Sequence, residues 1–300
     1  MNDRNDFLPE VRNASWWSGD SRMAANGRAN EAVLQKIGLM EREDLSQVEA
    51  VQMGHVMQPV IGRLVQDRLH LELKDFDIVL QNDQNPWLKS HFDFITTDGK
   101  TLVEAKNYSA SVRNKFSAET NLIPAADMAQ LIHESACAGV DNVILAVLFG
   151  GNELQTFQFT ITDEQRTELI QEMAVYWAAV QHKEPLKPET TLQARKTWPI
   201  DNGGRVTAPQ DIERVCHMLT QVKASIKTLE QQEEELLIHI QNCLGGNSEL
   251  VTVDGKVLAT WKTSKSSKKF DQALFAKAYP EMYQQFFTEV PGSRRFLLKG

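Results

Sequence analysis

The chain has 300 residues, 42% of them hydrophobic, and a formal net charge of −8 at pH 7. Such a chain can bury the core of one large or two smaller globular domains, and its charge argues against a protein that holds nucleic acid through a generally basic surface. Three widely spaced cysteines without a CxxC pair indicate neither a disulfide scaffold nor a zinc site. With no signal peptide and no apolar run of membrane-spanning length, a soluble cytoplasmic protein without membrane contact is expected.

Two helices are predicted before the first strand. The first covers residues 22–37, and Ser21 and Arg22 at its start can bind an anion through backbone N–H groups, hydroxyl and guanidinium together. An ordinary helix N-cap is the simpler interpretation of Ser21. The second helix covers residues 47–69 and contains Pro59, which removes a hydrogen bond and should kink or restart the helix.

A strand is expected at residues 71–80, and a β-hairpin is expected at residues 90–108. Within the hairpin, Asp98-Gly99 separates two alternating, β-prone runs. This dipeptide favours a two-residue turn with positive φ at both residues. Such a turn would fix the register of the two strands, because residues at equal distances from the turn are paired.

In this register Asp93 lies opposite Glu104, and His91 lies opposite Lys106. Since side chains alternate between the two faces of a strand, all four share one face and mostly apolar side chains occupy the other. Two carboxylates placed directly opposite each other repel, so a cation between them is expected. Mg²⁺ prefers carboxylate oxygens and keeps several waters, one of which Lys106 can polarise. A salt bridge on a solvated strand is the competing interpretation.

The segments around this hairpin follow an order that resembles the YqaJ-like viral recombinase family, to which the lambda-type exonuclease is related, within the PD-(D/E)xK nuclease superfamily. The resemblance covers roughly residues 12–182. The matching residues are Gly19-Asp20-Ser21, Lys36-Ile37-Gly38, the segment from Gly54 to Pro59, Asp93, Glu104-Ala105-Lys106 and Gln130. This resemblance implies a core in which a central mixed sheet is flanked by helices.

The resemblance also implies roles for individual residues. The implied metal ligands are Asp93, Glu104, the Ala105 carbonyl and Gln58, for two Mg²⁺ ions that Mn²⁺ can replace. The implied catalytic residues are Asp93, Glu104, Lys106, which polarises water, and Gln130, which positions the water or the phosphate. The end of a DNA duplex would be bound by Ser21, Arg22 and Arg28.

One position departs from the family pattern. Family members usually carry Glu just before the proline, whereas this chain has Gln58, and an amide oxygen ligates a cation only weakly. Three explanations stay open. The second metal is held more loosely, Gln58 acts through a water, or His55, one helical turn earlier, takes over.

Beyond the hairpin, the pattern predicts alternating helices and strands. A helix over residues 125–138 would carry Gln130, and residues 142–149 form the near-continuous apolar run of a central strand. Residues 153–160 alternate and should pair with that strand. Thr162 should cap the next helix. Together these elements predict a mixed α/β fold.

The composition changes after this core. Residues 1–185 are assigned to the nuclease domain, residues 186–206 to an irregular linker and residues 207–300 to a C-terminal region with a long helix and a β-hairpin. Apolar residues at heptad spacing over residues 209–244 favour a coiled-coil arm or a helical hairpin partner. A long helix packed on its own domain fits the pattern equally.

The leading functional hypothesis is a Mg²⁺-dependent exonuclease of phage recombination type that acts on double-stranded DNA ends. The resemblance implies 5′-to-3′ digestion, 3′ overhangs for a single-strand annealing protein, and a homo-oligomeric ring around DNA. An endonuclease of the same superfamily would share every catalytic residue. A catalytically weakened DNA-end-binding assembly protein is the non-enzyme alternative.

Overall fold

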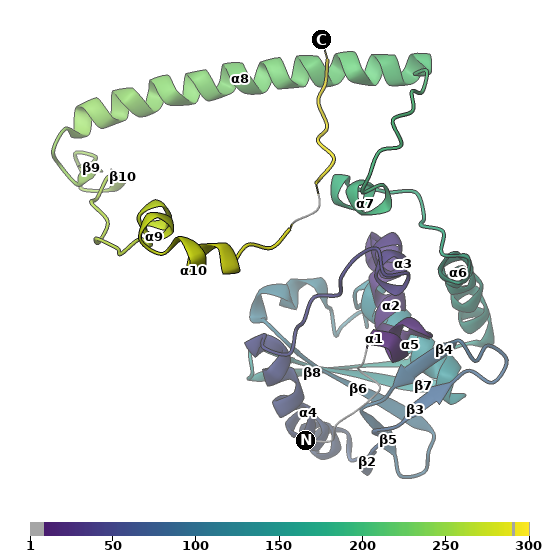
Figure 1. Ribbon diagram of the computed structural model, residues 1–300. Helices are drawn as coiled ribbons and strands as arrows, with labels where there is room; N and C mark the ends of the chain where they lie inside the picture. Colours follow the sequence, from purple (N-terminus) through teal and green to yellow (C-terminus); the bar gives the residue numbers. More distant parts are fainter. Residues whose placement is uncertain (1–8, 290–291, 300) are drawn as a thin grey trace. The chain divides into compact units, whose positions relative to one another are not determined.

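The computed structural model describes residues 9–289 and 292–299, and the chain divides into two compact units, Met1–Pro199 and Ile200–Gly300 (Figure 1). The division falls within the expected linker. Part of that linker is ordered as helix α7 (Thr191–Thr197), which packs on α3 (Ala29–Lys36) of the first unit. The expectation of an irregular linker throughout is therefore wrong, because α7 belongs to the first unit.

The first unit is organised around a five-stranded mixed sheet of strand order β2-β5-β6-β7-β8. Its strands are β2 (Leu73–Asp75), β5 (Phe94–Thr96), β6 (Thr101–Tyr108), β7 (Asn142–Phe149) and β8 (Glu153–Thr160). Strands β6 and β7 run parallel, and the other pairs are antiparallel. Strand β6 pairs with β7 over its whole length but with β5 only through Leu102 and Val103. The second half of β6 therefore has an open edge.

Helices cover both faces of this sheet, which confirms the predicted mixed sheet flanked by helices. Helix α4 (Glu49–Leu69) packs Ile61 and Val65 on one face. It approaches closely because Gly62 has no side chain, and a Cβ there would lie 2.6 Å from the Phe94 ring. Helix α5 (Ala125–Ala138) packs on the other face, and α6 (Asp163–His182) packs against α5.

A smaller sheet of order β1-β4-β3 corrects two expectations about the strands. Its members are β1 (Trp16–Trp17), β4 (Leu88–His91) and β3 (Val79–Gln81). The expected strand over residues 71–80 is two short strands, β2 and β3, in different sheets. The expected first hairpin strand also breaks, so His91 pairs with Val79 and not with Lys106.

Aromatic packing gives the physical reason for the break after His91. Phe92 is buried against Phe76, with ring centroids 5.4 Å apart, while Phe94 is buried with the α4 cluster on the opposite face of the sheet. The Phe76 N–H bonds to the Asp93 carbonyl at 3.1 Å. The chain therefore turns between the two sheets at Asp93.

The hairpin turn differs from the prediction, but its register does not. Residues 97–100 connect β5 to β6, Gly99 has φ of 73°, and Asp98 does not have a positive φ. The Asp98 carboxylate accepts the Thr96 hydroxyl at 2.6 Å and the Lys100 N–H at 3.1 Å. Because the loop is longer by one residue on each side, Phe94 still pairs with Val103.

The N-terminal helices also differ from their predicted form. The chain forms α1 (Pro9–Asn13), then α2 (Ser18–Met23), a π-helical turn (Ala24–Arg28) and α3. A single helix over residues 22–37 is wrong, because Gly27 adopts a left-handed φ of 72° that breaks it. In contrast, α4 runs through Pro59 without restarting.

The second unit contains the predicted long helix and hairpin. Helix α8 (Gln210–Leu244) is followed by β9 (Glu249–Val251) and β10 (Val257–Thr260), which pair antiparallel, and then by α9 (Gln272–Ala278) and α10 (Pro280–Gln285). No helix within residues 9–289 and 292–299 has the length and apolar character needed to cross a membrane.

Buried His133 joins α5 to α2 and β4. Its Nε2 donates to the Lys89 carbonyl at 2.9 Å, so its Nδ1 is left to accept the Ser21 hydroxyl at 2.8 Å. Burial lowers the pKa of His133 to about 4. The neutral ring thus holds α5, which carries Gln130, against α2, which carries Arg22.

This contact predicts a pH dependence of stability. His133 is ordinarily protonated below about pH 6.5 in the unfolded chain, whereas the folded chain resists protonation until about pH 4. Stability is therefore present above pH 6.5 and is lost as the pH falls towards 4, by about 3 kcal/mol at most. Urea unfolding of His133→Gln should show a flatter pH slope in this window. The exposed control His182→Gln should keep the wild-type slope, and equal slopes in all three proteins would contradict the assignment.

Candidate active site

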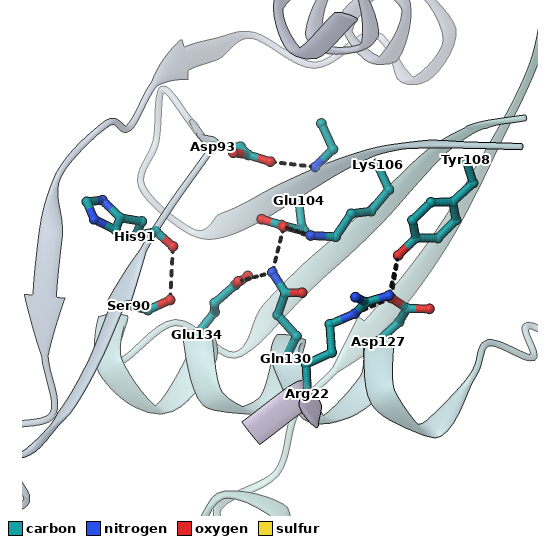
Figure 2. Close-up of polar contacts among 11 residues, drawn as sticks. Arg22, Ser90, His91, Asp93, Glu104, Lys106, Tyr108, Asp127, Gln130 and Glu134 are labelled. Carbon is teal, nitrogen blue, oxygen red and sulfur yellow. Dashed lines mark hydrogen bonds and ion pairs between the residues drawn. The ribbon is translucent and has the colours of Figure 1, made fainter. Parts of the chain in front are cut away.

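The candidate site lies where β6 loses its β5 neighbour (Figure 2). Asp93 lies at the chain break, and its Oδ2 accepts the Ala105 N–H at 2.8 Å. Since the N–H and C=O groups of one strand residue point to the same edge, the Ala105 carbonyl faces Asp93 as well. Burial and the charge of Glu104 raise the pKa of Asp93 well above its usual range. A cation at this edge would relieve that repulsion.

Glu104 is buried and lies at the centre of the site. Its Oε1 accepts hydrogen bonds from Lys106 Nζ at 2.5 Å and from Gln130 Nε2 at 2.6 Å. Burial alone would lower the pKa of Lys106, but Glu104, Tyr108 and Asp93 together raise it. These neighbouring groups therefore favour the charged form of Lys106. The structure thus brings Asp93, Glu104, Lys106 and Gln130 together.

Glu134 is a further member of this group, and the sequence interpretation missed it. It lies one helical turn after Gln130, whose Nε2 donates to Glu134 Oε1 at 2.8 Å. The Glu134 side chain is buried, and burial and the charge of Glu104 raise its pKa well above the usual range. Glu134 lies four residues after Gln130, and residues at this spacing share one face of a helix. This spacing is the sequence signal that could have indicated Glu134 as a site residue.

The Arg22 side chain extends from α2 towards Tyr108 at the end of β6. Its Nη2 donates to the Tyr108 hydroxyl at 2.8 Å and its Nε donates to Asp127 Oδ1 at 3.1 Å, while the Tyr108 hydroxyl donates to the same oxygen at 2.7 Å. Tyr108 follows Lys106 on β6, and Asp127 precedes Gln130 on α5. The Arg22 side chain keeps 37% of its surface exposed. It can therefore meet an anion from solvent while its orientation is held.

The other two residues expected at the DNA end lie elsewhere. The Ser21 hydroxyl is fully buried, where it accepts the Trp16 Nε1–H at 3.1 Å and contacts His133. Arg28 is paired with Glu31 on α3. Of the three, only Arg22 contributes to the group around Tyr108 and Asp127.

Helix α4 brings the two alternative metal ligands to the side of Asp93. A cavity of about 330 Å³ is lined by His55, Gln58, Pro59, Asp75, Asp77, Asp93 and Phe94. The structure therefore places both His55 and Gln58 beside Asp93. Asp75, the last residue of β2, and Asp77 were not anticipated as neighbours of the site.

The donor set determines which metal fits. Among the residues that the structure describes, no three His, Cys, Asp or Glu side chains form a group able to hold a metal ion by themselves. Two carboxylates and one backbone carbonyl are hard oxygen donors, and Mg²⁺ is usually bound by one or two carboxylates with waters completing its shell. The residues at the β6 edge therefore fit Mg²⁺ better than Zn²⁺.

Two of the segments that carry the family resemblance meet in the interior. Lys36 Nζ lies 2.6 Å from Asp20 Oδ2 and donates to the carbonyls of Arg12 and Ser15. Both charged side chains are buried, and a buried ion pair with further hydrogen bonds loses several kcal/mol if one partner is removed. This pair fixes the start of α2, and with it Arg22.

Comparisons with known proteins give structural neighbours only. No protein-family model matches the chain, and no curated protein sequence matches it. The alkaline exonuclease LHK-Exo from Laribacter hongkongensis is 12% identical with a TM-score of 0.46, over 58% of this chain and 91% of that one. A putative exonuclease from Eubacterium rectale is 10% identical with a TM-score of 0.43, over 72% and 97%. A phage-related exonuclease from Haemophilus somnus is 13% identical with a TM-score of 0.37, over 54% and 79%.

Proposed function

We propose that this chain is a Mg²⁺-dependent exonuclease that digests one strand of duplex DNA from an end. The single observation that carries the proposal is the convergence of Asp93, Glu104, Lys106 and Gln130 at the open edge of β6. The stability of the sheet does not require these groups to meet. They are a buried acid (Glu104), a partly buried acid (Asp93), a lysine paired with Glu104 and an amide on a separate helix. Their combination fits hydrolysis of a phosphodiester.

Each residue has a role that follows from its contacts. When bound, Mg²⁺ acts as a Lewis acid that activates water and neutralises charge on the phosphate. Asp93 and Glu104, with the Ala105 carbonyl, would hold it. Lys106 places a fixed positive charge where a water or a phosphate oxygen can be oriented, and Gln130 holds the Glu104 carboxylate in place. Gln58 or His55 would contribute to a second ion from the neighbouring cavity.

Arg22 is proposed to bind a phosphate of the DNA. Arginine forms strong charge-assisted bonds to phosphate oxygens, and Tyr108 and Asp127 hold this one close to Lys106 and Gln130 along the same strand and helix. The 5′-to-3′ direction, a single-strand annealing partner and a ring-shaped homo-oligomer stay predictions from the family resemblance.

Two alternatives make different predictions from the exonuclease. An endonuclease would use the same residues but would not need an end. A weakened assembly protein would not need them at all, and the close contacts among Asp93, Glu104 and Lys106 argue against it because such contacts have no role in assembly. The proposal is tested by incubating linear and closed circular duplexes of one sequence with Mg²⁺ and following product lengths.

For the exonuclease, the linear duplex should shorten progressively while the circle survives. Glu104→Gln should reduce the rate by orders of magnitude, because it removes a metal ligand and a charge at little steric cost. Linearisation of the circle would favour the endonuclease. Equal activity of wild type and Glu104→Gln would place the active site elsewhere, and lack of cleavage by both in Mg²⁺ or Mn²⁺ would support the assembly protein.

The proposed role of Arg22 predicts a dependence on the phosphate at the DNA end. Wild type should digest 5′-phosphorylated duplexes faster than dephosphorylated ones. Arg22→Ala should lose this preference, about 10- to 100-fold, as expected for one charged hydrogen-bonding group. Arg28→Ala is the matched control, because its partner is Glu31, and it should keep the preference. Equal rates on both ends in wild type would show that Arg22 does not recognise a terminal phosphate.

A further inference from the structure

Helix α8 carries a long apolar stripe that its own unit leaves exposed. Its members recur every three or four residues over 32 positions, and the described side chains of this stripe expose between 39% and 64% of their surface where a value is given. The stripe consists of Ile212, Val215, Leu219, Val222, Ile226, Leu229, Glu233, Leu236, Ile240 and Cys243. An apolar face of this length on a soluble helix calls for a partner surface.

The spacing assigns heptad positions without a break. Five residues occupy the a position and five occupy the d position. The a residues are Ile212, Leu219, Ile226, Glu233 and Ile240, and the d residues are Val215, Val222, Leu229, Leu236 and Cys243. A seven-residue repeat held over this length is typical of a coiled coil. Glu233 is the only charged residue in the stripe.

We propose that α8 pairs with α8 of a second copy of this chain in an antiparallel coiled coil. Glu233 decides the direction of the pairing. In a parallel pair in register, Glu233 would face Glu233 of the other copy inside the apolar contact, and a buried pair of like charges is strongly unfavourable. In the antiparallel pair that aligns all ten stripe positions, Glu233 of one copy faces Val222 of the other. Lys223 is the next residue after Val222 on that second helix.

The positions that flank the stripe support the same direction. Interhelical contacts at these positions set the orientation of a coiled coil. In the antiparallel alignment, Lys223 of each copy lies beside Glu230 of the other, so two-fold symmetry creates the ion pair twice. The remaining flanking contacts, Cys216 with Leu237, Ser225 with Gln232 and Met218 with His239, contain no like charges. A parallel alignment would place Lys223 beside Met218 and form neither ion pair.

The contact is large enough to be stable. A helix of 35 residues is about 52 Å long, and a contact strip about 10 Å wide covers on the order of 500 Å² per chain. The pair would then bury on the order of 1,000 Å², which is the lower bound for a specific interface. The antiparallel pairing of two α8 helices has two-fold symmetry, whereas the subunits of a ring make head-to-tail contacts. The α8 pairing would therefore join two chains whether or not the protein also forms a ring.

The test is charge reversal measured in the full-length chain by sedimentation equilibrium. Wild type should associate beyond its monomer mass of 33.9 kDa. Lys223→Glu and Glu230→Lys should each weaken association roughly tenfold or more, because each sets like charges side by side twice. The double variant should recover wild-type affinity, since the two charges are exchanged. Both residues are exposed, and circular dichroism should show unchanged helix content.

If something other than a second copy of α8 covers the stripe, the same measurements should give different results. A wild-type monomer at tens of micromolar would mean that the chain's own segments or another protein cover the stripe, and would overturn the proposal. Association unaffected by the single reversals, or not restored in the double variant, would overturn it too. Mild oxidation provides a second readout. A parallel pair would bring the two Cys243 thiols together and form an interchain disulfide, which the antiparallel pair should not form.

Discussion

The repulsion between two neighbouring carboxylates at one strand edge is the constraint on which the site depends. Asp93 directly precedes β5, whose pairing with β6 places Phe94 opposite Val103, and burial together with the charge of Glu104 raises the pKa of Asp93. Lys106 partly compensates with its fixed charge. The proposed divalent cation would relieve the remaining deficit of positive charge at this edge.

The fold maintains this arrangement by ending a strand pairing where the site begins. Phe92 and Phe94 are buried on opposite sides of the sheet, so the chain at Asp93 cannot shift. The backbone hydrogen bond that β6 loses there is replaced by the bond from the Ala105 N–H to the Asp93 carboxylate. The Ala105 N–H at the open edge and the Asp93 carboxylate thus satisfy each other, as buried polar groups generally do.

Local patterns predicted much of the fold. Helix α5 and strands β7 and β8 have the expected bounds, because their apolar spacing is strong. The register predicted for the hairpin is confirmed at Phe94–Val103 and Ile95–Leu102 in spite of a wrong turn type, since the loop lengthened equally on both sides. The predictions that were wrong for the hairpin and for Ser21 failed because the structure there depends on contacts between distant segments of the chain. The break before Asp93 depends on Phe76, and the burial of Ser21 depends on His133, which is 112 residues away.

Thermal unfolding with and without Mg²⁺, together with nuclease assays, tests the cation site most directly. Mg²⁺ at 100 times its dissociation constant should stabilise wild type by about 2.7 kcal/mol. Lys106→Ala keeps both acids, so Mg²⁺ should still raise its Tm although its turnover collapses, whereas Glu104→Gln should lose most of the Mg²⁺ shift. An unchanged shift in Glu104→Gln, or full activity in Lys106→Ala, would contradict the account.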